Sequence, residues 1–502
     1  MNTSRTGKSI KNILFSLFGF VCTTLLQLVN RLMFVHFLPI EYLGIHGLFT
    51  NLISMLALSE LGIGSAMIYA LYKPVATKDK ERIKSLMALY KKLYWIIGCI
   101  IFILGLSLLP FLPRFMKEQP DIPYISFYFL LYVFNAGVSY FYTFKRSIII
   151  CNQEEYIPTL VTMITSILTR LIQIFVLYFT QSFFQYLLVQ IVFTLVENWI
   201  VSYIADKKYP YLKEKEVQPL KKKEIQNIQK NVYAMVFHKI GDVVVNATDN
   251  ILVSRLLGLS FVGYLYNYTM IFDLVSNVVL RIFSSLTPSL GNLIAIESRE
   301  KSEEVFYRLL FGNFWLVSFC CVCLYCLCQP FLSLWLGDSF ILDQSIVFVL
   351  CAVFYVMGMR RTALQYRSAA GLFYQDRYKP LIESVVNLAL SIPLTMHLGI
   401  VGVKLGTILS LLTTAFWMEG YILYKYYFQK SCLSYLYTQA KFGLITLICM
   451  ISIHALCSLV SLSGIPGFLL QGMLCVVGIN GIYLLFFYKK EEFQYYKKLI
   501  FK

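Results

Sequence analysis

Charged residues are scarce in this chain. They make up 14% of its 502 residues, whereas a soluble chain of this size typically carries about a quarter. Hydrophobic residues make up 58% of the chain, and they gather in runs of roughly twenty or more, the length that crosses a hydrocarbon core about 30 Å thick. This composition excludes an ordinary soluble protein.

Short segments of alternating polarity, which would indicate a membrane β-barrel, are also lacking. Backbone groups in lipid must form their hydrogen bonds within the segment, so the long apolar runs are predicted to be helices. The first run, from about 13 to 37, is too long for the core of a secretion signal, and we expect it to remain as a span. The sequence therefore predicts an all-α polytopic membrane protein with about fourteen transmembrane helices. The predicted spans are 12–37, 44–72, 85–112, 122–148, 158–180, 183–205, 233–257, 261–290, 303–328, 342–366, 378–397, 399–424, 439–460 and 465–488.

The basic residues indicate how these spans are oriented. The net charge is +17, and Lys and Arg gather at the N-terminus, in the connections that follow spans 2, 6, 8, 10 and 12, and in the C-terminal tail. The other connections are nearly free of them, with Arg114 and Lys117 as the clear exceptions. Loops rich in Lys and Arg stay in the cytoplasm. We therefore predict cytoplasmic N- and C-termini and a basic face that contacts anionic membrane lipids rather than nucleic acid.

The long polar connection 206–232 divides the chain, and the two sides are related. A shift of about 219 residues places the end of the first span and the start of the second, around Asn30 and Gly44, on the region of Asp249 and Gly263. Six spans are an even number, so both copies have the same orientation, as in a parallel repeat. We predict two pseudo-symmetric six-helix lobes, 1–205 and 233–424, an extra helix pair at 439–488 and a cytoplasmic tail at 489–502.

Polar residues form stripes at helical spacing within several spans. Such residues are costly in lipid and usually face the bundle interior or a water-filled cavity. With a rise of 1.5 Å per residue, Arg170 and Asp273 lie roughly 18 Å from a span end, near the middle of the membrane. Arg31 and Arg281 lie nearer the ends, so they could snorkel or line a cavity. Glu383 and Lys404 fall at span edges and are expected to be interfacial.

Several arginines near one cleft favour an anionic substrate, because a guanidinium stays charged and grips phosphate with two hydrogen bonds. The candidate substrate-binding residues are Arg31, Arg170, Arg281, Gln27, Asn30 and Asn277. The intramembrane carboxylates could form structural ion pairs or carry a coupling H⁺ or Na⁺, and the sequence leaves both open. These are Glu60, Glu197, Asp242, Asp249 and Asp273.

No catalytic or cofactor site is predicted. Neither a Gly-rich phosphate loop nor a nucleophile triad occurs. Five of the 13 cysteines lie in one apolar run without a neighbouring histidine, and we expect them to behave as small hydrophobic residues rather than as a metal site. These cysteines are Cys320, Cys321, Cys323, Cys326 and Cys328.

Three groups of motifs resemble one family. The string Glu41–Phe49, followed by Ser59–Ala66 and Leu71–Pro74, resembles the opening of Wzx-type polysaccharide repeat-unit flippases of the multidrug/oligosaccharidyl-lipid/polysaccharide exporter superfamily. Thr248–Ser254 with Val262 and Gly263 resembles the start of their second lobe, and Gly399–Thr407 resembles their Gly-rich twelfth helix. Lys404 is a departure, since the family usually has a small residue there. The resemblance extends over almost the whole chain.

The resemblance implies a fold like that of multidrug and toxic compound extrusion (MATE) transporters, in a bacterial cytoplasmic membrane. It implies flipping of an undecaprenyl-diphosphate-linked oligosaccharide for capsule, O-antigen (lipopolysaccharide) or exopolysaccharide synthesis, in partnership with a polymerase and chain-length proteins. It also implies a cationic cavity lined by arginines of spans 1 and 8, which Arg31 and Arg281 match by span. A multidrug or cation exporter of the same fold remains the alternative, with a membrane polymerase or glycosyltransferase as a weaker one, because the external connections are short.

Overall fold

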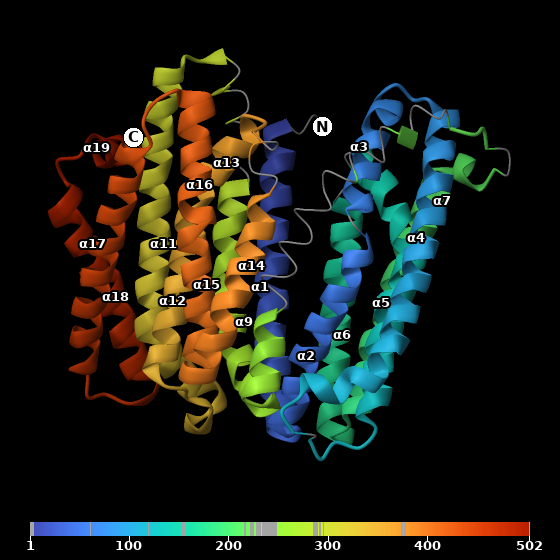
Figure 1. The fold of residues 1–502 in the computed structure, drawn as a ribbon, viewed down its shortest axis with the longest axis horizontal. Coiled ribbons are helices and arrows are strands. Elements are labelled where there is room, and N and C mark those ends of the chain that lie inside the picture. Colours follow the sequence, from blue (N-terminus) through green and yellow to red (C-terminus); the bar gives the residue numbers. More distant parts are fainter. Residues whose placement is uncertain are drawn as a thin grey trace. The chain divides into compact units, whose positions relative to one another are not determined.

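The computed structural model describes residues 5–60, 62–118, 120–152, 154, 156–214, 217–220, 225–226, 232, 248–284, 290, 293–294, 296–372, 375 and 378–500. These residues form helices and connections, with no strand among them (Figure 1). Eleven helical segments in the described ranges are long and apolar enough to cross a membrane. The all-helical membrane fold is confirmed, whereas the count of about fourteen stays a prediction, and most of the predicted span 233–257 lies outside the described residues.

The chain divides into two compact units, Met1–Gly263 and Tyr264–Lys502. This division falls within one helix, and the lobe boundaries expected from the sequence stay a prediction. In chain order, the helices that begin in the first unit are α1 (Arg5–Phe37), α2 (Ile40–Leu56), η1 (Ala57–Glu60), α3 (Ile63–Ala76), α4 (Lys80–Leu108), η2 (Leu109–Phe115), α5 (Ile125–Cys151), α6 (Tyr156–Thr180), α7 (Phe183–Lys208), η3 (Pro210–Lys213) and α9 (Leu259–Ser284).

The core of the first unit lies among α3, α4, α5 and α7. Met67, Tyr90, Ile148 and Ala205 belong to it, and each is at most 2% exposed. The second predicted span, 44–72, is broken into α2, η1 and α3. The break occurs at Gly62, whose φ of +72° is a backbone conformation that glycine adopts readily. Apolar periodicity continues across such a break, so hydropathy alone does not reveal it.

The second unit contains the rest of the helices, drawn from yellow to red in Figure 1. They are α11 (Arg299–Leu336), η4 (Asp338–Phe340), α12 (Gln344–Met359), α13 (Arg361–Ala369), α14 (Lys379–Leu398), α15 (Ile400–Thr413), α16 (Ala415–Leu423), η5 (Tyr424–Phe428), α17 (Leu433–Ser458), α18 (Gly464–Phe487) and α19 (Glu491–Ile500).

Helix α11 is central to the second unit and packs against α12, α17 and α18. Ser298 caps its start by accepting a hydrogen bond from the Lys301 amide, 3.2 Å away, and Gly337 with φ +97° ends it. Phe314 of α11 stacks on Phe442 of α17 with ring centroids 4.1 Å apart. Aromatic packing thus joins the predicted extra helix pair to the body of the unit.

The starts of α2 and α9 make a symmetrical contact. A Cβ added at Gly44 would come 2.1 Å from the Leu259 carbonyl oxygen, and one at Gly263 would come 2.7 Å from that of Ile40. The Ser260 hydroxyl donates to Glu41 Oε1 over 2.9 Å, and these two residues are 219 positions apart. The predicted shift is also 219, so residues that the shift makes equivalent meet at this contact.

Candidate functional site

A polar cluster lies where α1, α6 and α7 meet in the first unit. Its centre is Asn30 of α1, which is 3% exposed. Asn30 Nδ2 donates to Gln173 Oε1 of α6 over 3.1 Å, and Asn30 Oδ1 accepts from the Tyr186 hydroxyl of α7 over 3.1 Å. Gln173 Nε2 in turn donates to the Tyr186 carbonyl over 3.2 Å. The polar side chains at this helix junction therefore form hydrogen bonds with one another, as buried polar groups require.

Arg170 lies at the edge of this cluster, one turn before Gln173 on α6. Its Nη2 donates to Gln27 Oε1 of α1 over 3.5 Å, and its carbonyl accepts from Asn30 Nδ2 over 3.4 Å. The guanidinium is half-buried and lies near the middle of the helix. The structure thus brings Gln27, Asn30 and Arg170 together, as the stripes on two separate spans predict.

Arg31 follows Asn30 on α1 and is half-buried. It lies close enough to His46 of α2 for the two side chains to interact electrostatically. His46 Nδ1 is 2.5 Å from the Tyr132 hydroxyl of α5. Arg31 therefore belongs to the same unit as Arg170, and its role as a substrate contact stays a prediction.

Glu197 of α7 is held by three partners from α5 and α6. Thr162 donates to its Oε1 over 2.5 Å, and Thr165 donates to its Oε2 over 3.2 Å. Arg146 Nη1 lies 3.5 Å from Oε1. A carboxylate that is paired and hydrogen-bonded in this way fits the structural interpretation of Glu197, while a coupling role stays a prediction.

Glu60 lies in η1, beside the break between α2 and α3. The Tyr94 hydroxyl donates to Glu60 Oε1 over 2.7 Å, and Tyr90 donates to Tyr94 over 3.2 Å. In the described part of the chain, this carboxylate thus accepts a hydrogen bond from a tyrosine hydroxyl. A Cβ at Gly64 would lie 2.5 Å from both Glu60 Oε1 and the Tyr94 hydroxyl, so Gly64 makes room for this pair.

The remaining predicted residues lie around α9. Asp249 is 7% exposed and precedes it, whereas Asp242 lies outside the described residues. Asp273, Asn277 and Arg281 follow one another at intervals of four along α9, so they share one face, and all three are exposed. Lys404 of α15 lies close enough to Asp273 to interact with it electrostatically.

The second unit also buries a charged cluster that the sequence did not single out. Glu419 of α16 is 0% exposed. Arg360 donates to its two carboxylate oxygens from Nε over 3.1 Å and from Nη2 over 2.6 Å, and Lys379 Nζ lies 2.5 Å from Oε1. Glu383, which we expected at the interface, is 7% exposed, and its Oε1 is 3.9 Å from Arg360 Nη1. A count of charged residues within each predicted span could have identified Glu419. It could not have shown that Arg360 and Lys379, from other parts of the chain, are its partners.

The family described as "Polysaccharide biosynthesis protein" matches residues 9–294 of the chain. No curated protein sequence matches it. Among solved structures, the lipid II flippase MurJ in an inward closed conformation is similar with a TM-score of 0.66 at 15% identity, over 94% of this chain and 99% of that one. An inward-facing MATE-family multidrug resistance transporter is similar with a TM-score of 0.64 at 15% identity, over 80% of this chain and 94% of that one. A point mutant of the MATE transporter VcmN of Vibrio cholerae gives 0.59 at 15% identity, over 84% and 97%. At these identities the likeness establishes the fold alone.

Proposed function

This chain belongs to the polysaccharide biosynthesis protein family, and we propose that it is a flippase for an undecaprenyl-diphosphate-linked oligosaccharide. It would carry this repeat unit across the bacterial cytoplasmic membrane by alternating access, for capsule, O-antigen or exopolysaccharide synthesis. The polymerase and chain-length proteins would then act on the delivered unit. Both termini would lie in the cytoplasm, as the distribution of Lys and Arg predicts.

The observation that carries the proposal is the placement of Arg170 in the membrane-spanning helix α6. It contacts Gln27 and lies beside the hydrogen-bonded group of Asn30, Gln173 and Tyr186. A positive charge at this depth is costly unless it serves an anionic ligand or a partner. The diphosphate of the lipid carrier supplies that anion. Arg31, Arg281 and Asn277 are also proposed as substrate contacts.

A lipid substrate also agrees with an apolar cavity of about 610 Å³ in the second unit. Trp315 and Phe319 of α11, Leu484 of α18 and Phe493 of α19 contribute to its lining, together with Lys497. Such a surface suits hydrocarbon chains, with the lysine placed to meet a phosphate group. We propose that membrane lipid or the tail of the carrier occupies it.

Arg170→Ala should lower export of surface polysaccharide at least about tenfold, because a hydrogen bond to a charged group contributes about 1.5–3 kcal/mol. Arg170→Lys should retain part of the activity, since lysine keeps the positive charge but cannot form the bidentate hydrogen bonds that a guanidinium forms with phosphate. The amount of polysaccharide at the cell surface is the measurement, and immunoblots of membranes verify that each variant is present at the normal level.

The matched control is Arg308→Ala, which removes an arginine paired with Glu304 on α11. It should leave export unchanged. Full export by Arg170→Ala would contradict the role of this residue. Deletion of the gene should make lipid-linked oligosaccharide accumulate in the cytoplasmic leaflet, whereas accumulation of unjoined sugars would favour a polymerase or glycosyltransferase.

The second candidate is export of a drug or other cation by the same fold. Exposed Asp273 on α9 favours it, because this carboxylate lies in the predicted span 261–290, where it could bind a cationic substrate. We also propose that an intramembrane carboxylate binds the coupling ion, H⁺ or Na⁺. The candidates are Glu60, Glu197, Asp242, Asp249 and Asp273. Drug sensitivity of the deletion strain with normal surface polysaccharide would support this candidate.

A further inference from the structure

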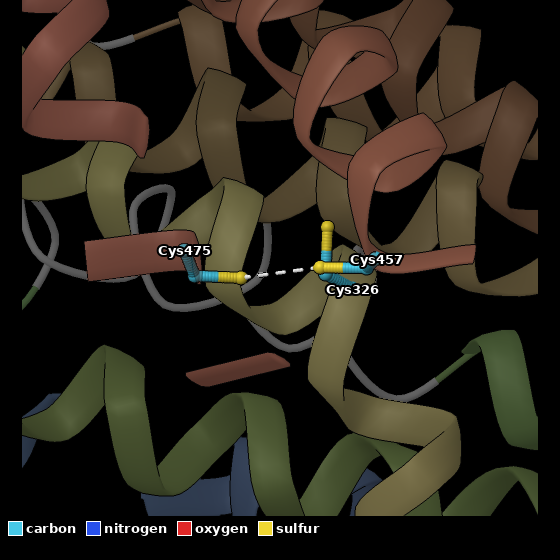
Figure 2. Close-up of side chains that lie close together, drawn as sticks. All are labelled: Cys326, Cys457 and Cys475. Atoms are coloured by element: carbon cyan, nitrogen blue, oxygen red, sulfur yellow. Dashed lines mark hydrogen bonds between the residues drawn. The ribbon is translucent and has the colours of Figure 1, made fainter. Parts of the chain in front are cut away.

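Three thiols from three different helices converge in the second unit. They belong to Cys326 of α11, Cys457 of α17 and Cys475 of α18, and their sulfur atoms all lie within 4.8 Å of one another. In Figure 2 the Cys475 thiol points toward the other two, and the dashed line joins Cys457 and Cys475, whose sulfurs are 4.0 Å apart. We searched the described residues for groups of at least three His, Cys, Asp or Glu side chains close enough together to bind one metal ion, and these three cysteines form such a group.

The spacing matches a metal ion bound by three sulfurs. A metal–sulfur bond of about 2.3 Å in a trigonal plane places the sulfurs about 4.0 Å apart, and the Cys457–Cys475 separation has this value. The other two separations are at most 4.8 Å, so small side-chain rotations would complete the triangle. Cys326, Cys457 and Cys475 are 5%, 4% and 0% exposed, so the group is shielded from solvent as well as compact.

The surroundings hold the group in place. Gln471, one turn before Cys475 on α18, donates through Nε2 to the Cys457 carbonyl over 3.4 Å. The Cys457 thiol lies 3.9 Å from the Gln471 carbonyl. Cys457 is also in the last turn of α17, next to the short connection 459–463.

We propose that Cys326, Cys457 and Cys475 bind one Cu(I) ion. Sulfur ligands select soft cations such as Cu(I) and Zn(II). Structural Zn(II) is almost always four-coordinate, whereas the three sulfurs that lie within 4.8 Å of one another match a three-coordinate ion. When Cu(I) binds, each of the three thiols loses its proton to water, because the thiolate is the form of cysteine that ligates a metal. The ion would tie the α17–α18 pair to α11.

The test is an anaerobic titration of the reduced, detergent-purified full-length protein with Cu(I), in competition with the colorimetric chelator bicinchoninate. We expect one tightly bound Cu(I) per chain, and X-ray absorption should show sulfur neighbours only. Cys326→Ala, Cys457→Ala and Cys475→Ala should each weaken binding at least tenfold. Cys328→Ala is the matched control, because Cys328 is also buried in α11 but lies outside the group, and it should retain the ion.

Four outcomes would overturn the proposal. They are absence of Cu(I) binding by a protein that elutes as a single folded species, binding that persists in all three variants, preferential binding of Zn(II), and loss of the ion in Cys328→Ala alone. Thermal unfolding supplies a second measurement. Cu(I) should raise the midpoint of the unmodified protein and of Cys328→Ala, and should leave the midpoint of a folded Cys475→Ala protein unchanged.

Discussion

At the scale of single residues, the second unit depends on one buried carboxylate. Glu419 is fully buried and faces both Arg360 and Lys379. A buried ion pair often adds little stability compared with apolar residues, but removal of one partner leaves the other charge uncompensated. Two cations share this one carboxylate, so its loss should have a larger effect than the loss of either cation.

Glu419→Gln should destabilise the protein by about 3–5 kcal/mol, the typical cost of an unpaired buried charge. The measurement is the midpoint of thermal unfolding in detergent. Glu303→Gln is the control: Glu303 pairs with the half-exposed Lys430, and such pairs contribute about 0–1 kcal/mol. The double variant Glu419→Gln/Lys379→Met should recover part of the loss. Equal midpoints for Glu419→Gln and Glu303→Gln would contradict this assignment.

The same residues indicate where sequence reasoning reaches its limit. Gln27, Asn30 and Arg170 could be predicted to face inward, because each belongs to a polar stripe on its own helix. Which stripes meet depends on packing between helices far apart in the sequence, as in Asn30 with Gln173, 143 positions away. For this reason the partners of Glu419 and the meeting of Cys326 with Cys457 and Cys475 were not predicted.

At the scale of elements, close packing of α14 against α15 requires glycine. Gly399 joins the two helices with φ +60°. A Cβ at Gly402 would lie 2.0 Å from the Leu394 carbonyl oxygen, and one at Gly406 would lie 2.6 Å from the Ser391 Cα. The opposing atoms belong to the backbone and cannot rotate away, so this Gly-rich segment has a packing role.

Gly402→Ala should therefore lower the stability by at least about 1–3 kcal/mol, the usual cost of overpacking. Gly472 of α18 offers a matched control, because a Cβ there would meet nothing within 4 Å. Gly472→Ala should be neutral or stabilising by up to about 1 kcal/mol, since alanine is the better helix former. Thermal unfolding of the two purified variants distinguishes them, and a Gly402→Ala midpoint equal to or above that of the unmodified protein would show that the two helices can separate without cost.

At the scale of the whole molecule, hydropathy was sufficient for the fold class, and the orientation inferred from the charge distribution stays a prediction. Apolar length predicts membrane helices wherever they are continuous, but it does not detect the break between α2 and α3 at Gly62. The repeat was visible in the sequence because both copies place a glycine where the starts of α2 and α9 cross. Gly44 and Gly263 allow that crossing, and the 219-residue spacing of Glu41 and Ser260 reproduces the predicted shift.

If the protein works by alternating access, this crossing must open during the transport cycle, because it lies at the predicted outer ends of the helices. Glu41 and Ser260 are in hydrogen-bond contact, 2.9 Å apart, so cysteines at both positions are within reach of a short bifunctional methanethiosulfonate. Treated Glu41→Cys/Ser260→Cys cells should stop exporting polysaccharide, and a reductant that cleaves the cross-link should restore export. Treated Glu41→Cys cells provide the control for the native cysteines and should export normally. Undiminished export by a fully cross-linked double variant would mean that transport proceeds while this contact stays closed.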